Sequence, residues 1–187
     1  MTARNVLLAT FGFALFVGAR AAPTAEARPR PGGQIGGRRF DANKTFGLGL
    51  ELGAPTGIVG KYFLSSDRAL DFGVGDIYSY RNRFGLHIYA DYLFHPVSLA
   101  STPDFELPLY VGIGGRFWDF EDRSGDINDS AFALGLRVPV GLSMDFNTVP
   151  LDLFVQLIPI FDLYFNYGAH GAAVDINASI GIRYWFN

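Results

Sequence analysis

The sequence predicts an all-β fold, an eight-stranded antiparallel up-and-down transmembrane β-barrel, on the strength of three observations. From residue 46 onward, apolar residues alternate with polar or small ones at period two, which is typical of strands with two unlike faces. Glycine (23) and phenylalanine (18) are both abundant in the 187 residues, which suits a sheet with aromatic and small side chains interleaved. Finally, 18% of the chain is charged, yet no position on the apolar face of the alternation carries a charge.

The alternation divides the chain into eight expected strands. They span residues 45–53, 57–64, 69–75, 84–94, 106–118, 131–142, 151–162 and 174–186. The third is the shortest and weakest. Pro139 and Pro159 fall inside the sixth and seventh, where each removes a donor from the ladder, so we expect a bulge or a rim position there. The connections 119–130 and 163–173 are expected to be long outer loops.

The second face of these strands carries charges of both signs with glycines between them. In a membrane barrel the apolar face points outward to lipid and the polar face lines the lumen, and the sheet must close so that every backbone group is paired. Eight strands leave an interior just wide enough for side chains, so we expect the charges to form a structural network that plugs the lumen. Its predicted members are Glu51, Lys61, Asp71, His87, Asp91, Arg116, Arg137, Asp152, Asp175 and Arg183.

The N-terminus has the pattern of a secretory signal peptide, predicted over residues 1–21. Arg4 supplies the positive charge, residues 6–18 form an apolar core of the signal, and Ala19-Arg20-Ala21 is a small-x-small cleavage site. Cleavage after residue 27 is an alternative. Residues 22–44 are rich in Arg, Pro and Gly and are expected to be a disordered basic linker, which leaves residues 45–187 for the barrel. The chain is therefore expected to be exported to the outer membrane of a Gram-negative type of cell.

Several kinds of chemistry are excluded or disfavoured by composition. There is no cysteine, which excludes disulfides, thiolate metal sites and lipid attachment through cysteine. The net charge of −3 argues against nucleic-acid binding. The histidines His87, His95 and His170 fall at different levels of the expected barrel, so we expect no shared metal site. No catalytic residue and no cofactor are predicted.

Two segments show a resemblance to known proteins. The chain ends in Tyr184-Trp185-Phe186-Asn187, which resembles the C-terminal assembly signal of outer-membrane barrels. Gly53-Ala54-Pro55-Thr56-Gly57 and the strands around it resemble the opening of a family of small bacterial outer-membrane barrels of unassigned function. The resemblance implies an eight-stranded barrel of the OmpA, OmpX or OmpW kind. It also implies contact with membrane lipid and lipopolysaccharide, and recognition of Tyr184, Trp185 and Phe186 by the barrel assembly machinery.

The function expected from these patterns is a structural or surface-interaction role in the outer membrane, and its surface ligand is left open. A small channel or carrier for small or apolar solutes is one alternative. A soluble exported lipid-binding barrel is another, and it would need the apolar face inside and the charges outside. A minor alternative is an outer-leaflet lipid-modifying enzyme that uses His170 with residues of the connection 119–130. Its candidate partners are Ser124, Ser130, Asp126 and Asp129.

Overall fold

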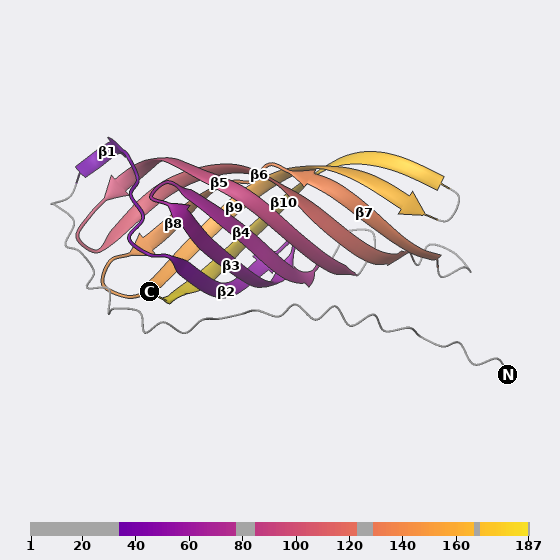
Figure 1. Cartoon of the computed structure of the whole chain (residues 1–187), viewed down its shortest axis with the longest axis horizontal. Coiled ribbons are helices and arrows are strands. Elements are labelled where there is room, and N and C mark those ends of the chain that lie inside the picture. Colours follow the sequence, from indigo (N-terminus) through magenta and orange to yellow (C-terminus); the bar gives the residue numbers. More distant parts are fainter. Residues whose placement is uncertain (1–33, 78–84, 123–128, 167–168, 187) are drawn as a thin grey trace.

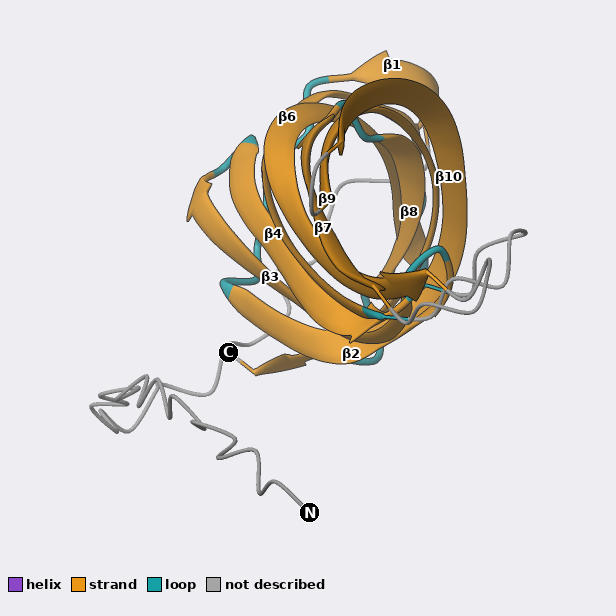
Figure 2. Ribbon diagram, turned by 90° about the vertical axis from the view of Figure 1, so that its right-hand side faces the viewer, coloured by secondary structure: helices purple, strands orange, loops and turns teal. Residues whose placement is uncertain are grey.

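A closed ring of antiparallel strands makes up most of the computed structural model, which describes residues 34–77, 85–122, 129–166 and 169–186 (Figures 1 and 2). The strands are β1 (Gln34–Arg38), β2 (Phe46–Gly53), β3 (Thr56–Ser65), β4 (Arg68–Asp76), β5 (Leu86–Ser101), β6 (Phe105–Asp122), β7 (Asp129–Arg137), β8 (Val140–Phe146), β9 (Leu151–Asn166) and β10 (Ala169–Phe186). Within these ranges no helix is long and apolar enough to cross a membrane.

The ring follows the order β5, β4, β3, β2, β10, β9, β7 and β6, and pairing of β6 with β5 closes it. Because β8 continues β7 between the same neighbours, the two form one strand of the ring, which therefore has eight strands. The prediction of an all-β, antiparallel, eight-stranded up-and-down fold is confirmed. Following cross-strand partners once around from Asp162 on β9 leads to Asp152 on β9, so the stagger is ten residues. Stagger of this kind requires the strands to tilt, typically by about 40°.

The break between β7 and β8 lies at Val138 and Pro139. Proline has no N–H to give to the ladder, so regular pairing stops there. The Pro139 carbonyl still accepts from the Gly112 N–H at 2.8 Å, and the Pro159 carbonyl accepts from the Val138 N–H at 3.0 Å. The wall therefore stays closed through an irregularity where both prolines sit, as expected of a bulge.

The strands differ in length, and this makes one side of the barrel taller. We call the end that holds Phe46 and Phe186 the base and the opposite end the far end. The prediction of a long loop over 163–173 is wrong, because β9 continues to Asn166 and β10 begins at Ala169. The hairpins β6–β7 and β9–β10 thus project beyond β2, β3 and β4 at the far end (Figure 1).

The N-terminal segment 34–44 corrects a second prediction, because it is not a disordered linker. Its β1 pairs with the end of β5, with Gln34 opposite Ser101. Further along, the Ala42 N–H donates to the Ser66 carbonyl at 2.8 Å, and Phe40 is only 2% exposed. The segment is ordered because at the base it pairs with the edge of β5 and buries the Phe40 side chain. The predicted signal peptide, its alternative cleavage site and the rest of the linker lie outside the described residues.

Replacing Gly53 tests the turn between β2 and β3. Gly53 has a φ of 127°, and a Cβ there would overlap the Ala178 carbonyl oxygen. We expect Gly53→Ala to lower the free energy of unfolding by roughly 2 kcal/mol, measured by urea unfolding in detergent. Gly115→Ala is the matched control, since its Cβ would meet nothing closer than the Gly135 carbonyl oxygen at 3.7 Å. Equal effects of the two substitutions would contradict this description of the turn.

Candidate functional site

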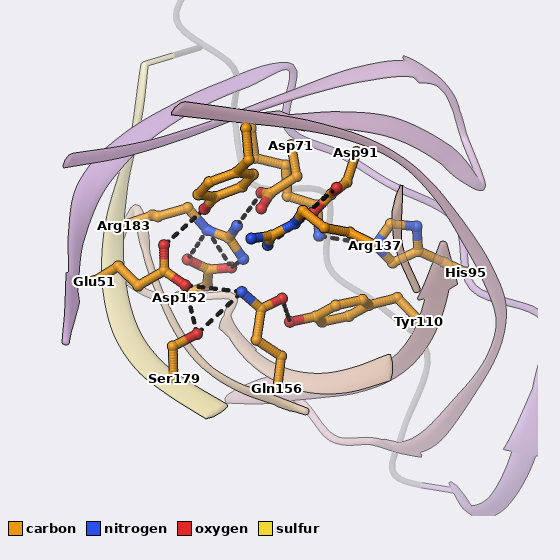
Figure 3. A network of polar contacts seen from close by, with 12 residues as sticks. Glu51, Asp71, Asp91, His95, Tyr110, Arg137, Asp152, Gln156, Ser179 and Arg183 are labelled. Carbon is orange, nitrogen blue, oxygen red and sulfur yellow. Dashed lines mark hydrogen bonds and ion pairs between the residues drawn. The ribbon is translucent and has the colours of Figure 1, made fainter. Parts of the chain in front are cut away.

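The two faces of the wall have opposite chemistry. Large apolar side chains point outward on every strand of the ring, with exposures such as 61% for Leu52 and 58% for Leu157. The alternate positions point into the lumen, where Lys61 is 1% and Arg137 0% exposed. The interior is therefore the place where polar chemistry is concentrated, and Figure 3 shows its central part.

Arg183 on β10 joins three strands near the base. Its Nε and Nη2 donate to Asp152 on β9 at 3.1 and 2.9 Å, and its Nη1 donates to Asp71 on β4 at 2.7 Å (Figure 3). The guanidinium also lies over the Phe154 ring, 4.2 Å from its centroid. All of these side chains are buried, so the two carboxylates and the ring together replace the water that a guanidinium would otherwise bind.

A second arginine, Arg137 on β7, holds Asp91 on β5. Its Nη2 lies 3.0 Å from Asp91 Oδ2, and its guanidinium stacks 3.9 Å from the Tyr89 ring centroid. Asp91 sits directly across from Asp71 on the neighbouring strand. Two carboxylates facing each other repel, so this pair of positions is tolerated because Arg137 and Arg183 each take one of them.

Glu51 forms the centre of a group of neutral hydrogen-bond donors. Its Oε2 accepts from the Tyr89 hydroxyl at 2.6 Å, and its Oε1 accepts from Gln156 Nε2 at 2.9 Å and from the Ser179 hydroxyl. The Tyr110 hydroxyl in turn donates to Gln156 Oε1 at 3.2 Å. The group joins β2, β5, β6, β9 and β10, and Figure 3 shows Glu51, Gln156, Ser179 and Tyr110 side by side in the lumen.

Toward the far end, Arg116 on β6 reaches over Gly135 of β7 to a carboxylate on β9. It donates from Nε to Asp162 Oδ1 on β9 at 2.9 Å, and from Nη2 to the other oxygen of the same carboxylate. The Tyr164 hydroxyl donates to Asp162 Oδ2 at 3.3 Å. The Arg116 guanidinium lies 5.4 Å from the Trp118 ring centroid.

The base of the lumen is closed by aromatic rings and by the segment 34–44. Lys61 Nζ is 2.8 Å from His95 Nε2, with the ammonium as donor, and it lies over the Tyr110 ring. Phe40 packs against His95 and Phe63, with centroid distances of 5.2 and 5.8 Å. Lys44 forms a buried ion pair with Asp145 on β8 and donates to the Phe146 carbonyl. The N-terminal segment therefore covers the opening of the lumen at the base.

The structure places nine of the ten predicted lumen residues inside the ring and leaves Asp175 out. Asp175 is exposed, and its carboxylate accepts from the N–H of its neighbour Ile176. His87 is buried but has no hydrogen-bond partner among the described residues. The interior also contains polar residues that sequence analysis did not assign to the network: Tyr89, Tyr110, Gln156, Asp162 and Ser179. All five share the parity of the charged face; counting neutral polar residues would have found four of them, and counting the last residue of the expected strand 151–162 would have found Asp162.

The residues proposed for a lipid-modifying site give no arrangement to assess. Ser124 and Asp126 lie outside the described residues, and the side chains of Asp129, Ser130 and His170 lie outside them too. Of the predicted assembly signal, Tyr184 and Phe186 point outward, whereas Trp185 is buried and stacks on Phe63 at 5.6 Å. In the described part of the chain, no group of three or more His, Asp or Glu side chains is placed to hold a metal ion.

Comparison with known proteins identifies a family and a fold. Residues 38–184 match the family described as "Protein of unknown function (DUF3996)", and the chain belongs to that family. The N-terminal β-barrel domain of OprF from Pseudomonas aeruginosa is similar in structure, with a TM-score of 0.50 and 17% sequence identity. The similarity covers 75% of this chain and 95% of the OprF domain, and it shows a shared barrel fold. No curated protein matches the sequence.

Substitution of Arg137 tests whether the interior charges depend on one another. Arg137→Met leaves Asp91 buried opposite Asp71, so we expect the free energy of unfolding to fall by about 3–5 kcal/mol in urea unfolding experiments. The double variant Arg137→Met/Asp91→Leu removes both charges and should recover most of that loss. A double variant as unstable as the single one would show that the ion pair is not what Arg137 contributes.

Substitution of Phe40 tests the closure of the base. Phe40→Ala removes a ring that is 2% exposed, so we expect a loss of about 3 kcal/mol in the free energy of unfolding. Arg39→Ala is the control, because the side chain of Arg39 is 80% exposed and its ion pair with Asp67 is long, at 3.6 Å. The control should change stability by less than about 0.5 kcal/mol. If the Phe40 variant is equally neutral, the segment does not pack as described.

Proposed function

Since the family to which the chain belongs has no assigned function, we propose from its structure that it is an integral outer-membrane β-barrel protein. Its role is structural or in surface interactions, it is not an enzyme, and its lumen is plugged by the charged network. The observation that carries this proposal is the inside-out distribution of side chains, with apolar residues outside and ionisable residues buried.

The outer face supports the membrane location. Exposed large apolar side chains occur on all the strands of the ring, for example Leu50, Ile88, Leu134 and Ile180. Soluble monomeric proteins rarely expose apolar patches larger than a few hundred Å², whereas membrane barrels carry an apolar band about 25 Å tall. Closure of the ring pairs the backbone within the wall, as hydrocarbon surroundings require. A soluble lipid-binding barrel needs the opposite orientation of the two faces.

The interior supports a plug rather than a channel. Arg183 occupies the lumen near the base, Arg137 and Arg116 occupy it nearer the far end, and each is bound to a carboxylate on another strand. Phe40 and Trp185 close the base below them. A channel for small solutes would need these bulky, mutually bonded side chains to move apart.

The proposal extends to the partners of the barrel. The outward apolar side chains contact lipid, and the tall far end, with hairpins β6–β7 and β9–β10, faces the lipopolysaccharide leaflet and the cell exterior. Tyr184, Trp185 and Phe186 at the end of β10 are the segment that the barrel assembly machinery recognises. The far-end hairpins are the elements available to a surface ligand.

Cell fractionation with gel electrophoresis tests the membrane location. We expect the full chain in the outer-membrane fraction, as a band that changes mobility on boiling because a closed barrel resists unfolding by the gel's detergent until it is heated. The mature protein is expected to begin at Ala22, or at Arg28 if the alternative site is cleaved. A soluble periplasmic protein whose mobility does not change on heating would refute the proposal.

Planar-bilayer recording separates a plug from a channel. The wild-type protein is expected to show no steady conductance, because the network and the segment 34–44 fill the lumen. The double variant Arg137→Met/Asp91→Leu removes one ion pair but keeps those of Arg116 and Arg183, so it should also show no steady conductance. A stable open level in the wild-type protein would favour the channel alternative.

A further inference from the structure

The far-end part of the lumen holds several buried N–H groups that point at no acceptor. No hydrogen-bond partner among the described residues is present for Arg116 Nη1, Arg137 Nη1, Asn177 Nδ2 or the ring nitrogens of His87, one of which is an N–H donor in the neutral imidazole. The four residues are at most 7% exposed. Buried polar groups in proteins are normally satisfied, so a cluster of unsatisfied ones indicates a group that the chain itself does not supply.

These four residues lie at one level of the barrel. His87 and Arg137 both pack on the Tyr89 ring, His87 at 5.6 Å between centroids and Arg137 at 3.9 Å. Arg116 lies directly across from Tyr89 on the neighbouring strand. The ten-residue stagger of the ring brings Asn177, on β10, to the same height on another part of the wall. We call this group the donor cluster.

The carboxylates nearby do not satisfy the donor cluster. Both oxygens of Asp162 accept from Arg116 Nε and Nη2, and Asp162 also accepts from Tyr164. Both oxygens of Asp91 accept from Arg137 Nε. In each guanidinium, Nε and Nη2 face the carboxylate, so Nη1 remains without a hydrogen-bond partner among the described residues.

We propose that the donor cluster binds a small monovalent anion of the size of chloride inside the lumen. The two arginines are already matched by two aspartates, so the site offers N–H donors without any unpaired carboxylate to repel an anion. A water molecule brings two donors, whereas the cluster offers one acceptor, the unprotonated ring nitrogen of His87; a halide only accepts, which matches a group made up mainly of N–H donors.

Bromide tests the location of this site directly. We expect crystals of the full chain, grown in sodium bromide, to show an anomalous scattering peak within hydrogen-bond reach of Arg116 Nη1, Arg137 Nη1 and His87. Bromide peaks confined to the protein surface, or an ordered water without anomalous signal at the cluster, would overturn the proposal.

Stability in solution tests the same site without crystals. In detergent, the urea midpoint should rise saturably with sodium chloride and not with sodium gluconate at equal ionic strength. At a chloride concentration ten times the dissociation constant, the unfolding equilibrium constant should fall about tenfold. His87→Phe and Asn177→Leu should each reduce this chloride-specific gain.

His95→Phe is the matched control, because it removes a buried histidine from the same strand at the base of the lumen. Its stability can fall, but its chloride-specific gain should equal that of the wild-type protein. Equal midpoints in chloride and gluconate for the wild-type protein, or an undiminished gain in both cluster variants, would overturn the proposal.

Discussion

The matching of buried arginines to carboxylates on other strands is the constraint on which the rest of the barrel depends. Arg183 links β10 to β9 and β4, Arg137 links β7 to β5, and Arg116 links β6 to β9. An unmatched charge in this interior would be strongly destabilising, and the charged side chain could not turn to the outer face instead, because that face is apolar. A one-residue slip of any strand would turn its charged side chains outward, so the same pairs also specify register.

The space for these side chains comes from glycines placed opposite aromatic rings. Gly181 lies across from Phe154, Gly141 from Tyr110 and Gly73 from Tyr89, and in each case the ring covers the position that a glycine Cβ would occupy. The rings in turn stack against charged groups: Phe154 against the Arg183 guanidinium and Tyr89 against that of Arg137. The joint abundance of glycine and aromatic residues in the sequence is therefore a packing requirement of a narrow, filled lumen.

The period-two pattern was enough to predict the fold and the direction in which residues such as Lys61 and Arg183 point, because parity alone decides the face of a strand. It could not predict how strands extend beyond the ring, so Asp175 was placed in the lumen although it lies exposed at the far end. Phe40 and Lys44 belong to a segment without periodicity, and their burial depends on the base that other strands build. The break at Pro139 was foreseeable in kind, since proline cannot donate to the ladder.

The absence of native cysteine allows the central claim to be tested by single-cysteine spin labels along β10. Labels at outward positions 180 and 182 and at inward positions 177 and 179 would be compared for collision with oxygen, which enters lipid, and with a water-soluble paramagnetic reagent. We expect high oxygen accessibility at 180 and 182 in reconstituted bilayers and protection from both reagents at 177 and 179. Access of the water-soluble reagent to 180 and 182 would contradict a barrel that faces lipid with its apolar side and keeps its charges inside.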